Sequence, residues 1–286
     1  MTPPESTQVP FHFSHSYHPR NSELGQFIYP VNSRRAKGLS LGININPDKK
    51  CSFDCSYCQV IRTTKTTSIP ITLDQVLNEL QIWLEKMQHG KHIGHTLKDI
   101  SIAGDGEPTQ VKFLPELIPE IIQMRDGFGF KDRKLILFTN GTKIDRPDLQ
   151  PALKLMGDSN GEIWIKLDFW DQSSLQVINR SKIKIDRLKA KLINVSQINP
   201  VVVQSCFFKG NQQKYADSYY QPFVQNLKNM VAEGFCINRI QVYTLARLPA
   251  DSTLHPWDRD TMDRIGKLIQ TECSIKTEVF YGSEEF

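Results

Sequence analysis

Residues 39–58 read LSLGININPDKKCSFDCSYC, and this stretch decides the fold class. Leu39, Leu41, Ile43 and Ile45 alternate with small or polar residues, a pattern that is typical of a β-strand. Three cysteines follow the strand within eight residues. A strand that runs into a loop rich in metal-binding side chains is typical of α/β proteins, in which functional groups gather at the carboxyl ends of the strands.

The rest of the chain repeats the same alternation of short apolar runs and helical patterns. Thr72 and Gln75 form a capping-box pattern at the start of an amphipathic helix that runs to Met87. The connections are too long for hairpins, so the strands are expected to be parallel, with helices outside them. Six or seven strands predict a partial (β/α)6-type TIM barrel; the later ones are expected at 100–103, 135–138, 163–167, 201–208, 240–245 and 275–280.

The first part of the chain lacks a sustained period and is rich in proline, serine and histidine. We therefore expect an N-terminal extension over residues 1–36 and the barrel domain over residues 37–286. The histidines of residues 11–18 suggest metal binding, but a lightly packed segment explains them better.

Composition narrows the class of protein. The chain has 286 residues, and no apolar run approaches the ~18 residues that a membrane span needs. The N-terminus shows no secretory signal, so we expect a cytoplasmic protein without a membrane partner. The net charge of +4 and the basic clusters at 34–37, 49–50 and 182–191 permit an RNA partner, although a solvated surface explains them more simply.

The spacing of Cys51, Cys55 and Cys58 indicates metal binding, since a disulfide framework spreads its cysteines more evenly. A cubane cluster normally takes four cysteines, one for each iron. With three local ligands, one iron keeps an open position for a cofactor or substrate. The remaining cysteines, Cys206, Cys236 and Cys273, belong to no close pair, and we interpret them as ordinary packed or surface residues.

A zinc site is the alternative for this triplet. A structural zinc needs a fourth protein ligand, and His89, His92 or His95 could supply it. These histidines lie in a glycine-containing stretch that is more typical of a loop between a helix and a strand. We therefore favour the iron–sulfur interpretation.

The motif Cys51-x-x-x-Cys55-x-Tyr57-Cys58 after a first strand resembles the signature of the radical S-adenosylmethionine (SAM) superfamily, and the resemblance covers residues 38–282. It implies a radical SAM core and a [4Fe–4S] cluster held by Cys51, Cys55 and Cys58. SAM would chelate the fourth iron, and one electron from a flavodoxin- or ferredoxin-like donor would yield a 5′-deoxyadenosyl radical. The protein would position these groups and exclude side reactions.

The same resemblance implies residues that contact SAM, although the catalytic residues stay unknown. The turn 104–108 resembles the family's Gly-Gly-Glu motif with Asp105 inserted, and Glu107 would receive the amino group of SAM. Tyr57 would lie near the adenine. Polar residues at later strand ends complete the predicted SAM-binding set, which is Tyr57, Gly104, Asp105, Gly106, Glu107, Asn140, Lys166, Asp168, Ser205 and Arg247. A buried ion pair is the alternative for Lys166 and Asp168.

Residues 41–44, 101–109 and 241–247 resemble the wyosine-synthase-related branch of that superfamily, which includes enzymes that rebuild a guanine base in tRNA. The chain has no second cysteine triplet, so the chemistry of a second cluster does not carry over. We expect a monomeric enzyme that acts on an unidentified substrate, for which an RNA base is one candidate. The alternatives are a radical activase of a partner protein and a non-catalytic metal- or redox-binding module.

Overall fold

The computed structural model describes residues 26–60, 62, 70–89, 96–210, 220–247, 249 and 251–282. These residues form one eight-stranded sheet with the order β1-β2-β3-β4-β5-β6-β8-β10. Every neighbouring pair is parallel except β1 and β2. The strands are β1 Ile28–Ser33, β2 Gly38–Ile43, β3 Leu97–Ile102, β4 Lys134–Thr139, β5 Gly161–Lys166, β6 Val201–Cys206, β8 Ile237–Tyr243 and β10 Thr277–Phe280.

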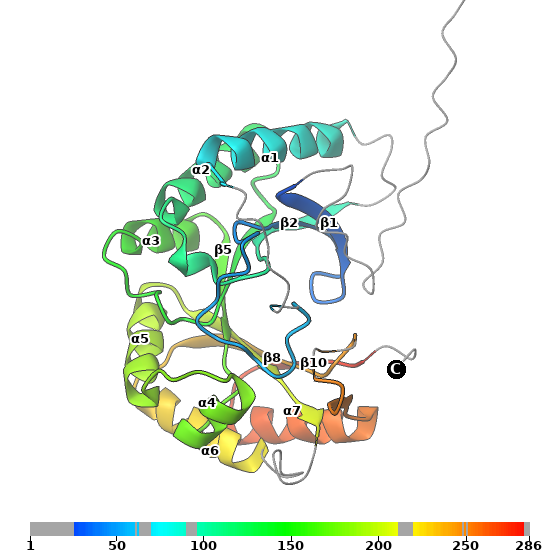
Figure 1. Cartoon of the computed structure of the whole chain (residues 1–286), viewed down its shortest axis with the longest axis vertical. Coiled ribbons are helices and arrows are strands. Elements are labelled where there is room, and N and C mark those ends of the chain that lie inside the picture. The colour runs from blue at the N-terminus through cyan, green and yellow to red at the C-terminus, as the bar shows by residue number, and fades with distance from the viewer. Residues whose placement is uncertain are drawn as a thin grey trace, which may run out of the picture.

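The helices lie along the outer face of the curved sheet and leave its inner face open on one side (Figure 1). This arrangement confirms the predicted partial barrel with a parallel sheet. The helices are α1 Leu73–Gln88, α2 Leu114–Gly127, α3 Gln150–Asp158, α4 Gln172–Ile178, α5 Ile185–Ile198, α6 Tyr220–Ala232 and α7 Arg259–Cys273, with a short 3₁₀ helix η1 over Pro108–Gln110.

Apolar side chains between the sheet and the helices form the core. In α1, Val76, Leu80, Trp83 and Leu84 are buried, which confirms the predicted apolar face of this helix. Its first turn carries the predicted capping box, because the Thr72 hydroxyl accepts from the Gln75 N–H and the Gln75 side chain accepts from the Thr72 N–H.

The inner face of the sheet carries a different set of side chains. At its amino-terminal end, Glu162 accepts hydrogen bonds from both Arg239 (2.9 and 2.7 Å) and Lys134. Arg239 Nε also lies 3.4 Å from Glu278. These four residues come from β4, β5, β8 and β10, so an ion-pair network links four strands at this end of the barrel.

Strand β1 is a feature that the sequence pattern does not predict. It lies within residues 1–36, which we assigned to an extension, and it pairs antiparallel with β2 to form the edge of the sheet. Glu79 of α1 accepts hydrogen bonds from the backbone N–H groups of Phe27 and Ile28, which fixes the start of the strand. The predicted boundary at residue 37 falls in the turn between β1 and β2.

The strand predicted over 201–208 is divided in the structure. Strand β6 ends at Cys206, and Phe208–Lys209 forms β7, which pairs with β9 (His255–Pro256) in a separate two-stranded sheet.

Several predictions fall outside the described residues, including most of the N-terminal extension with its histidines, and His92 and His95. No helix in the described part of the chain is long and apolar enough to span a membrane.

Candidate functional site

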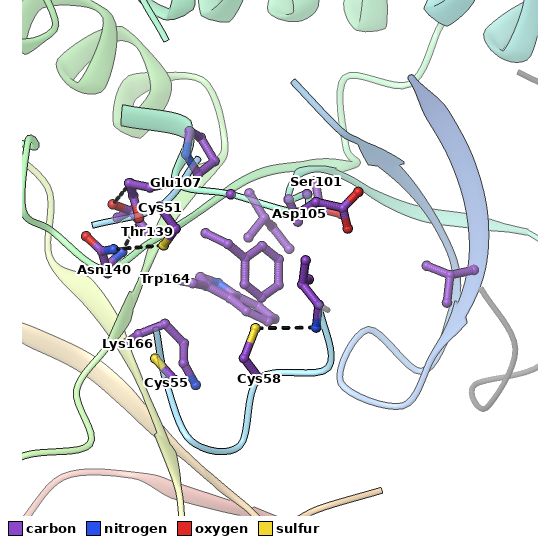
Figure 2. Close-up of a pocket in the computed structure, with 18 of the residues that line it drawn as sticks. Cys51, Cys55, Cys58, Ser101, Asp105, Glu107, Thr139, Asn140, Trp164 and Lys166 are labelled. Atoms are coloured by element: carbon purple, nitrogen blue, oxygen red, sulfur yellow. Dashed lines mark hydrogen bonds between the residues drawn. The ribbon is translucent and has the colours of Figure 1, made fainter. Parts of the chain in front are cut away.

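Cys51, Cys55 and Cys58 line one cavity of about 340 Å³ at the carboxyl ends of the strands (Figure 2). The loop that carries them is fixed against the end of α4. The Asp54 N–H donates to the Asn179 carbonyl (3.0 Å) and the Ser56 N–H donates to the Ile178 carbonyl (2.8 Å). The structure therefore brings the three predicted ligands to a common cavity.

Each cysteine sulfur accepts a hydrogen bond from a different side chain. The donors are Asn140 to Cys51 (3.5 Å), Asn179 to Cys55 (3.2 Å) and Arg62 to Cys58 (3.6 Å). Sequence reasoning singled out Asn140 but missed the other two. Arg62 lies four residues beyond Cys58, a position that could have drawn attention to it, whereas Asn179 follows a helix and belongs to no motif.

Burial favours the protonated thiols of Cys51 and Cys55 in the absence of a cation. Burial and the nearby charge of Asp168 raise the pKa of the Cys55 thiol to about 12. Burial and Glu107 also raise the pKa of the Cys51 thiol. Because thiolates are the ligands, metal binding at this loop has to release these protons.

The turn after β3 packs against the start of the cysteine loop. Gly104, Asp105, Gly106 and Glu107 all line the cavity. The Glu107 N–H donates to the Lys50 carbonyl at 2.9 Å. A Cβ atom at Gly106 would lie 2.1 Å from that same carbonyl oxygen, so the close approach of the two backbones requires glycine here.

The Glu107 carboxylate is surrounded by protein donors. Its Oε1 accepts from the Thr109 N–H (3.1 Å), the Thr109 hydroxyl (2.6 Å) and the Thr139 hydroxyl (2.5 Å), and its Oε2 accepts from the Asn140 N–H (2.7 Å). A carboxylate has about four acceptor positions. Glu107 therefore joins the ends of β3 and β4 and fixes Asn140, which contacts Cys51.

Asp168 lies behind the cavity wall, and its carboxylate is fully buried. It accepts hydrogen bonds from the Tyr57 hydroxyl, the Asn179 amide (3.3 Å) and the Cys206 N–H (2.7 Å). Tyr57 itself lines the cavity. Asp168 thus ties the cysteine loop to β6 and the end of α4.

The other predicted residues occupy two kinds of position. Lys166 and Arg247 line the cavity, and Lys166 Nζ lies 3.8 Å from Asp168, the ion pair that was the alternative for these residues. The Lys166 ammonium also donates to the Tyr243 hydroxyl. Ser205 is fully buried and donates to the Leu167 carbonyl (2.5 Å), so it supports the end of β5 from behind.

The remaining cysteines do not line this cavity. Cys206 is buried beside Tyr57 and Phe208, Cys236 lies near Gly234, and Cys273 ends α7. His89, one of the alternative zinc ligands, lies exposed at the end of α1 with its Nδ1 2.7 Å from the Glu85 carbonyl.

Residues 45–216 match the family model described as the radical SAM superfamily, which is more than half of the chain. The chain belongs to the radical SAM superfamily.

Among curated proteins, this radical SAM chain is 27% identical over 259 residues to a protein named GTPase Obg from Brachyspira hyodysenteriae, covering 87% of the chain and 34% of that protein. It is 35% identical over 152 residues to UPF0026 protein MJ1312 from Methanocaldococcus jannaschii, covering 53% of the chain and 43% of that protein. The chain thus spans between a third and a half of the length of these relatives.

Solved structures share the fold. A radical SAM methyltransferase from Sphaerobacter thermophilus superposes with a TM-score of 0.61 at 15% identity, over 89% of this chain and 69% of that one. TYW1 with a lysine–pyruvate adduct bound gives a TM-score of 0.59 at 14% identity, over 88% of this chain and 86% of that one. At these identities the likeness concerns the fold alone.

Membership of the superfamily implies a [4Fe–4S] cluster and SAM, and the donor set fits them. Three thiols, each with an N–H donor at its sulfur, line the same cavity as the turn after β3. Among the described residues, no three His, Cys, Asp or Glu side chains converge on a point that would hold a single metal ion.

Proposed function

We propose that this radical SAM enzyme cleaves SAM reductively at a [4Fe–4S] cluster held by Cys51, Cys55 and Cys58. The observation that carries the proposal is the cavity that these cysteines share with the turn at residues 104–108. When bound, the cluster supplies one electron and SAM supplies the 5′-deoxyadenosyl radical that removes a hydrogen atom from the substrate.

Some residues of the predicted SAM-binding set contact SAM in this proposal, and the others hold those residues in place. We assign contact roles to seven members that line the cavity: Tyr57, Gly104, Asp105, Gly106, Asn140, Lys166 and Arg247. Glu107, Asp168 and Ser205 act as positioning residues, since their polar atoms bind the protein itself. Glu107 orients Asn140, and Asp168 orients Tyr57.

Anaerobic reconstitution with iron and sulfide tests the cluster assignment. We expect wild-type protein to bind four irons per chain and the electron paramagnetic resonance signal of its reduced cluster to change when SAM is added. Cys58→Ala should lose both properties, whereas Cys236→Ala, which alters a half-buried cysteine outside the cavity, should keep them. Loss of the cluster in Cys236→Ala alone would overturn the assignment.

For the substrate we infer an RNA base or another small aromatic molecule, within the wyosine-synthase-related branch. The aromatic rings of Phe138 and Trp164 in the cavity wall support a planar substrate. Basic side chains at 182–191 add an exposed positive surface that suits RNA.

The RNA proposal predicts that RNA stimulates SAM turnover. Total RNA should increase the rate of 5′-deoxyadenosine formation at least tenfold over the rate without RNA, and mass spectrometry of the digested RNA should reveal a modified nucleoside. Stimulation by a protein fraction that resists ribonuclease would instead support the radical activase.

A further inference from the structure

The turn between β1 and β2 carries two consecutive arginines, and both line the cavity. The guanidinium of Arg34 donates to the carbonyl of Tyr281, which directly follows β10. Strands β1 and β10 are the two edges of the open sheet. This hydrogen bond therefore joins the edges of the sheet and fixes the turn across the open side of the barrel, where β1 and the end of β10 face each other (Figure 1).

Arg35, the next residue, lies over an aromatic surface inside the barrel. Its guanidinium carbon is 5.5 Å from the ring centre of Phe138, 6.0 Å from that of Trp164 and 5.2 Å from that of Tyr243. These rings come from β4, β5 and β8 and are fixed in place. The Trp164 indole donates to Glu162 at 2.8 Å, and Phe138 packs edge-on against Trp164 with ring centres 4.9 Å apart.

The N–H groups of Arg35 are unused. In the described part of the chain, no side chain or carbonyl accepts a hydrogen bond from this guanidinium, and no carboxylate forms an ion pair with it. Contacts with ring faces use the flat face of the guanidinium and leave the donors at its edge available. Arg239, which also faces the inside of the barrel, shows the contrast, because it forms a two-pronged pair with Glu162.

No nitrogen of Arg35 is among the buried side-chain atoms without a partner in the described chain, so its donors stay accessible from the cavity to a ligand with a matching oxyanion. The positive charge of Lys166, on the same side of the cavity as Arg35, also favours an anion. Lys166 Nζ lies 4.5 Å from the ring centre of Tyr243, so two cations lie against one ring. The fork of N–H donors on arginine matches a carboxylate or a phosphate, which accepts two hydrogen bonds at once.

We propose that Arg35 binds an oxyanion, carboxylate or phosphate, of the substrate and holds the substrate against the Phe138–Trp164–Tyr243 surface. This inference rests on the proposed function, since it names a feature of the molecule on which the radical acts. Phe138 and Trp164 lie within their strands, and Asp99, which acts electrostatically on Arg35, is the third residue of β3. Arg35 thus lies deeper in the barrel than the strand-end loops assigned to SAM.

Fluorine magnetic resonance with three small probes tests this site on the reconstituted protein. The probes are 4-fluorobenzoate, 4-fluorophenyl phosphate and the neutral 4-fluorobenzamide. We expect at least one anionic probe to bind ten or more times tighter than the amide. Arg35→Gln should abolish that preference, and Arg35→Lys should keep part of it, because lysine retains the charge but not the fork. Arg264→Gln, an exposed arginine on α7, is the matched control and should bind the probes as the wild type does.

Equal binding of all three probes to the wild type, or an undiminished preference in Arg35→Gln, would overturn the proposal. The carboxylate that binds Arg35 could belong to the substrate or to SAM. Measuring SAM affinity through the signal of the reduced cluster distinguishes the two. A fall in SAM affinity in Arg35→Gln as large as the fall in probe affinity would assign Arg35 to SAM and overturn the substrate role. Failure of every variant to cleave SAM would contradict the proposed function without altering the result with the probes.

Discussion

At the scale of single residues, the site consists of groups that touch the cavity and groups that hold them. Glu107 belongs to the second kind, because four donors from Thr109, Thr139 and Asn140 occupy its carboxylate. Its sequence context suggested a direct bond to the amino group of SAM. The difference between these two roles is measurable.

Glu107→Gln should destabilise the protein before it affects SAM. The substitution puts an amide NH₂ where an oxygen accepts hydrogen bonds, which leaves buried donors without acceptors, at a cost of about 1–3 kcal/mol in the free energy of unfolding. Urea unfolding of the protein without its cluster measures this loss. Thr109→Val, which removes the one hydrogen bond from the Thr109 hydroxyl and keeps the Thr109 N–H, is the control and should lose less. Unchanged stability together with lost SAM binding would show that Glu107 contacts SAM instead.

Asp99 should make anion binding at Arg35 depend on pH. Burial raises the pKa of Asp99 to about 6, and the charge of Glu162 raises it further. The hydrogen bond from the Ser40 hydroxyl (2.5 Å) and the charges of Arg35 and Lys134 act in the opposite direction. Asp99 is neutral below that pH, and above it the negative charge of Asp99 weakens the attraction of Arg35 for an anion through the electrostatic interaction between the two residues. The affinity for 4-fluorobenzenesulfonate, an anion throughout, should fall several-fold from pH 5 to pH 7.5. Asp99→Asn should show little change, and an equal fall in that variant would contradict the explanation.

At the scale of elements, local sequence patterns predicted the helices and strands that are stabilised by neighbouring residues. The capping box of Thr72 and Gln75 uses neighbouring residues, and α1 begins where it indicates. Strand β1 pairs with β2 across the short turn at 34–37, but its start depends on Glu79, which accepts the Ile28 N–H from 51 positions further along the chain, and its own residues carry no clear signal. The division between β6 and β7 likewise depends on β9, about fifty residues further along the chain.

Arg34 offers a test of how the turn between β1 and β2 is held. Arg34→Ala removes the hydrogen bond to the Tyr281 carbonyl and should cost about 1 kcal/mol of stability. Hydrogen exchange should accelerate at the backbone amides of β1 and β10 and stay unchanged in α3. Arg187→Ala is the matched surface control. Equal protection of β1 in Arg34→Ala and the wild type would show that the hydrogen bond does not hold the edges together.

At the scale of the whole molecule, the order of strands and helices followed from the alternation of buried runs, and the carboxyl ends of those strands carry the site. Asn179 and Arg62, which contact the cysteine sulfurs, could not be found in this way. Asn179 reaches Cys55 from 124 positions along the chain, and only the packing of α4 on the cysteine loop brings them together. The family resemblance predicted the three cysteine ligands, whereas the side chains that donate to their sulfurs were found only in the structure.

The ion-pair network at the base of the barrel should control acid stability. Burial alone would raise the pKa of Glu162, but hydrogen bonds from Arg239, Lys134 and Trp164 outweigh it and lower the pKa to about 2. A lowered pKa means that the charged carboxylate adds stability above its unfolded pKa of 4.5, and that this contribution disappears as the pH falls towards 2.

Glu162→Gln should therefore lose at most about 3 kcal/mol at pH 7, measured by urea unfolding of the protein without its cluster. The difference from the wild type should shrink steadily between pH 4.5 and pH 2. A difference that stays constant over this range would show that the charge of Glu162 contributes nothing.

The most direct test of the account is the formation of 5′-deoxyadenosine. The protein would be reconstituted with iron and sulfide without oxygen, reduced, and supplied with SAM, with Cys55→Ala treated in parallel. The account predicts 5′-deoxyadenosine from the wild type and none above background from Cys55→Ala. A reduced cluster in the wild-type protein that neither binds nor cleaves SAM would contradict it, and the cysteine loop would then belong to a non-catalytic redox module.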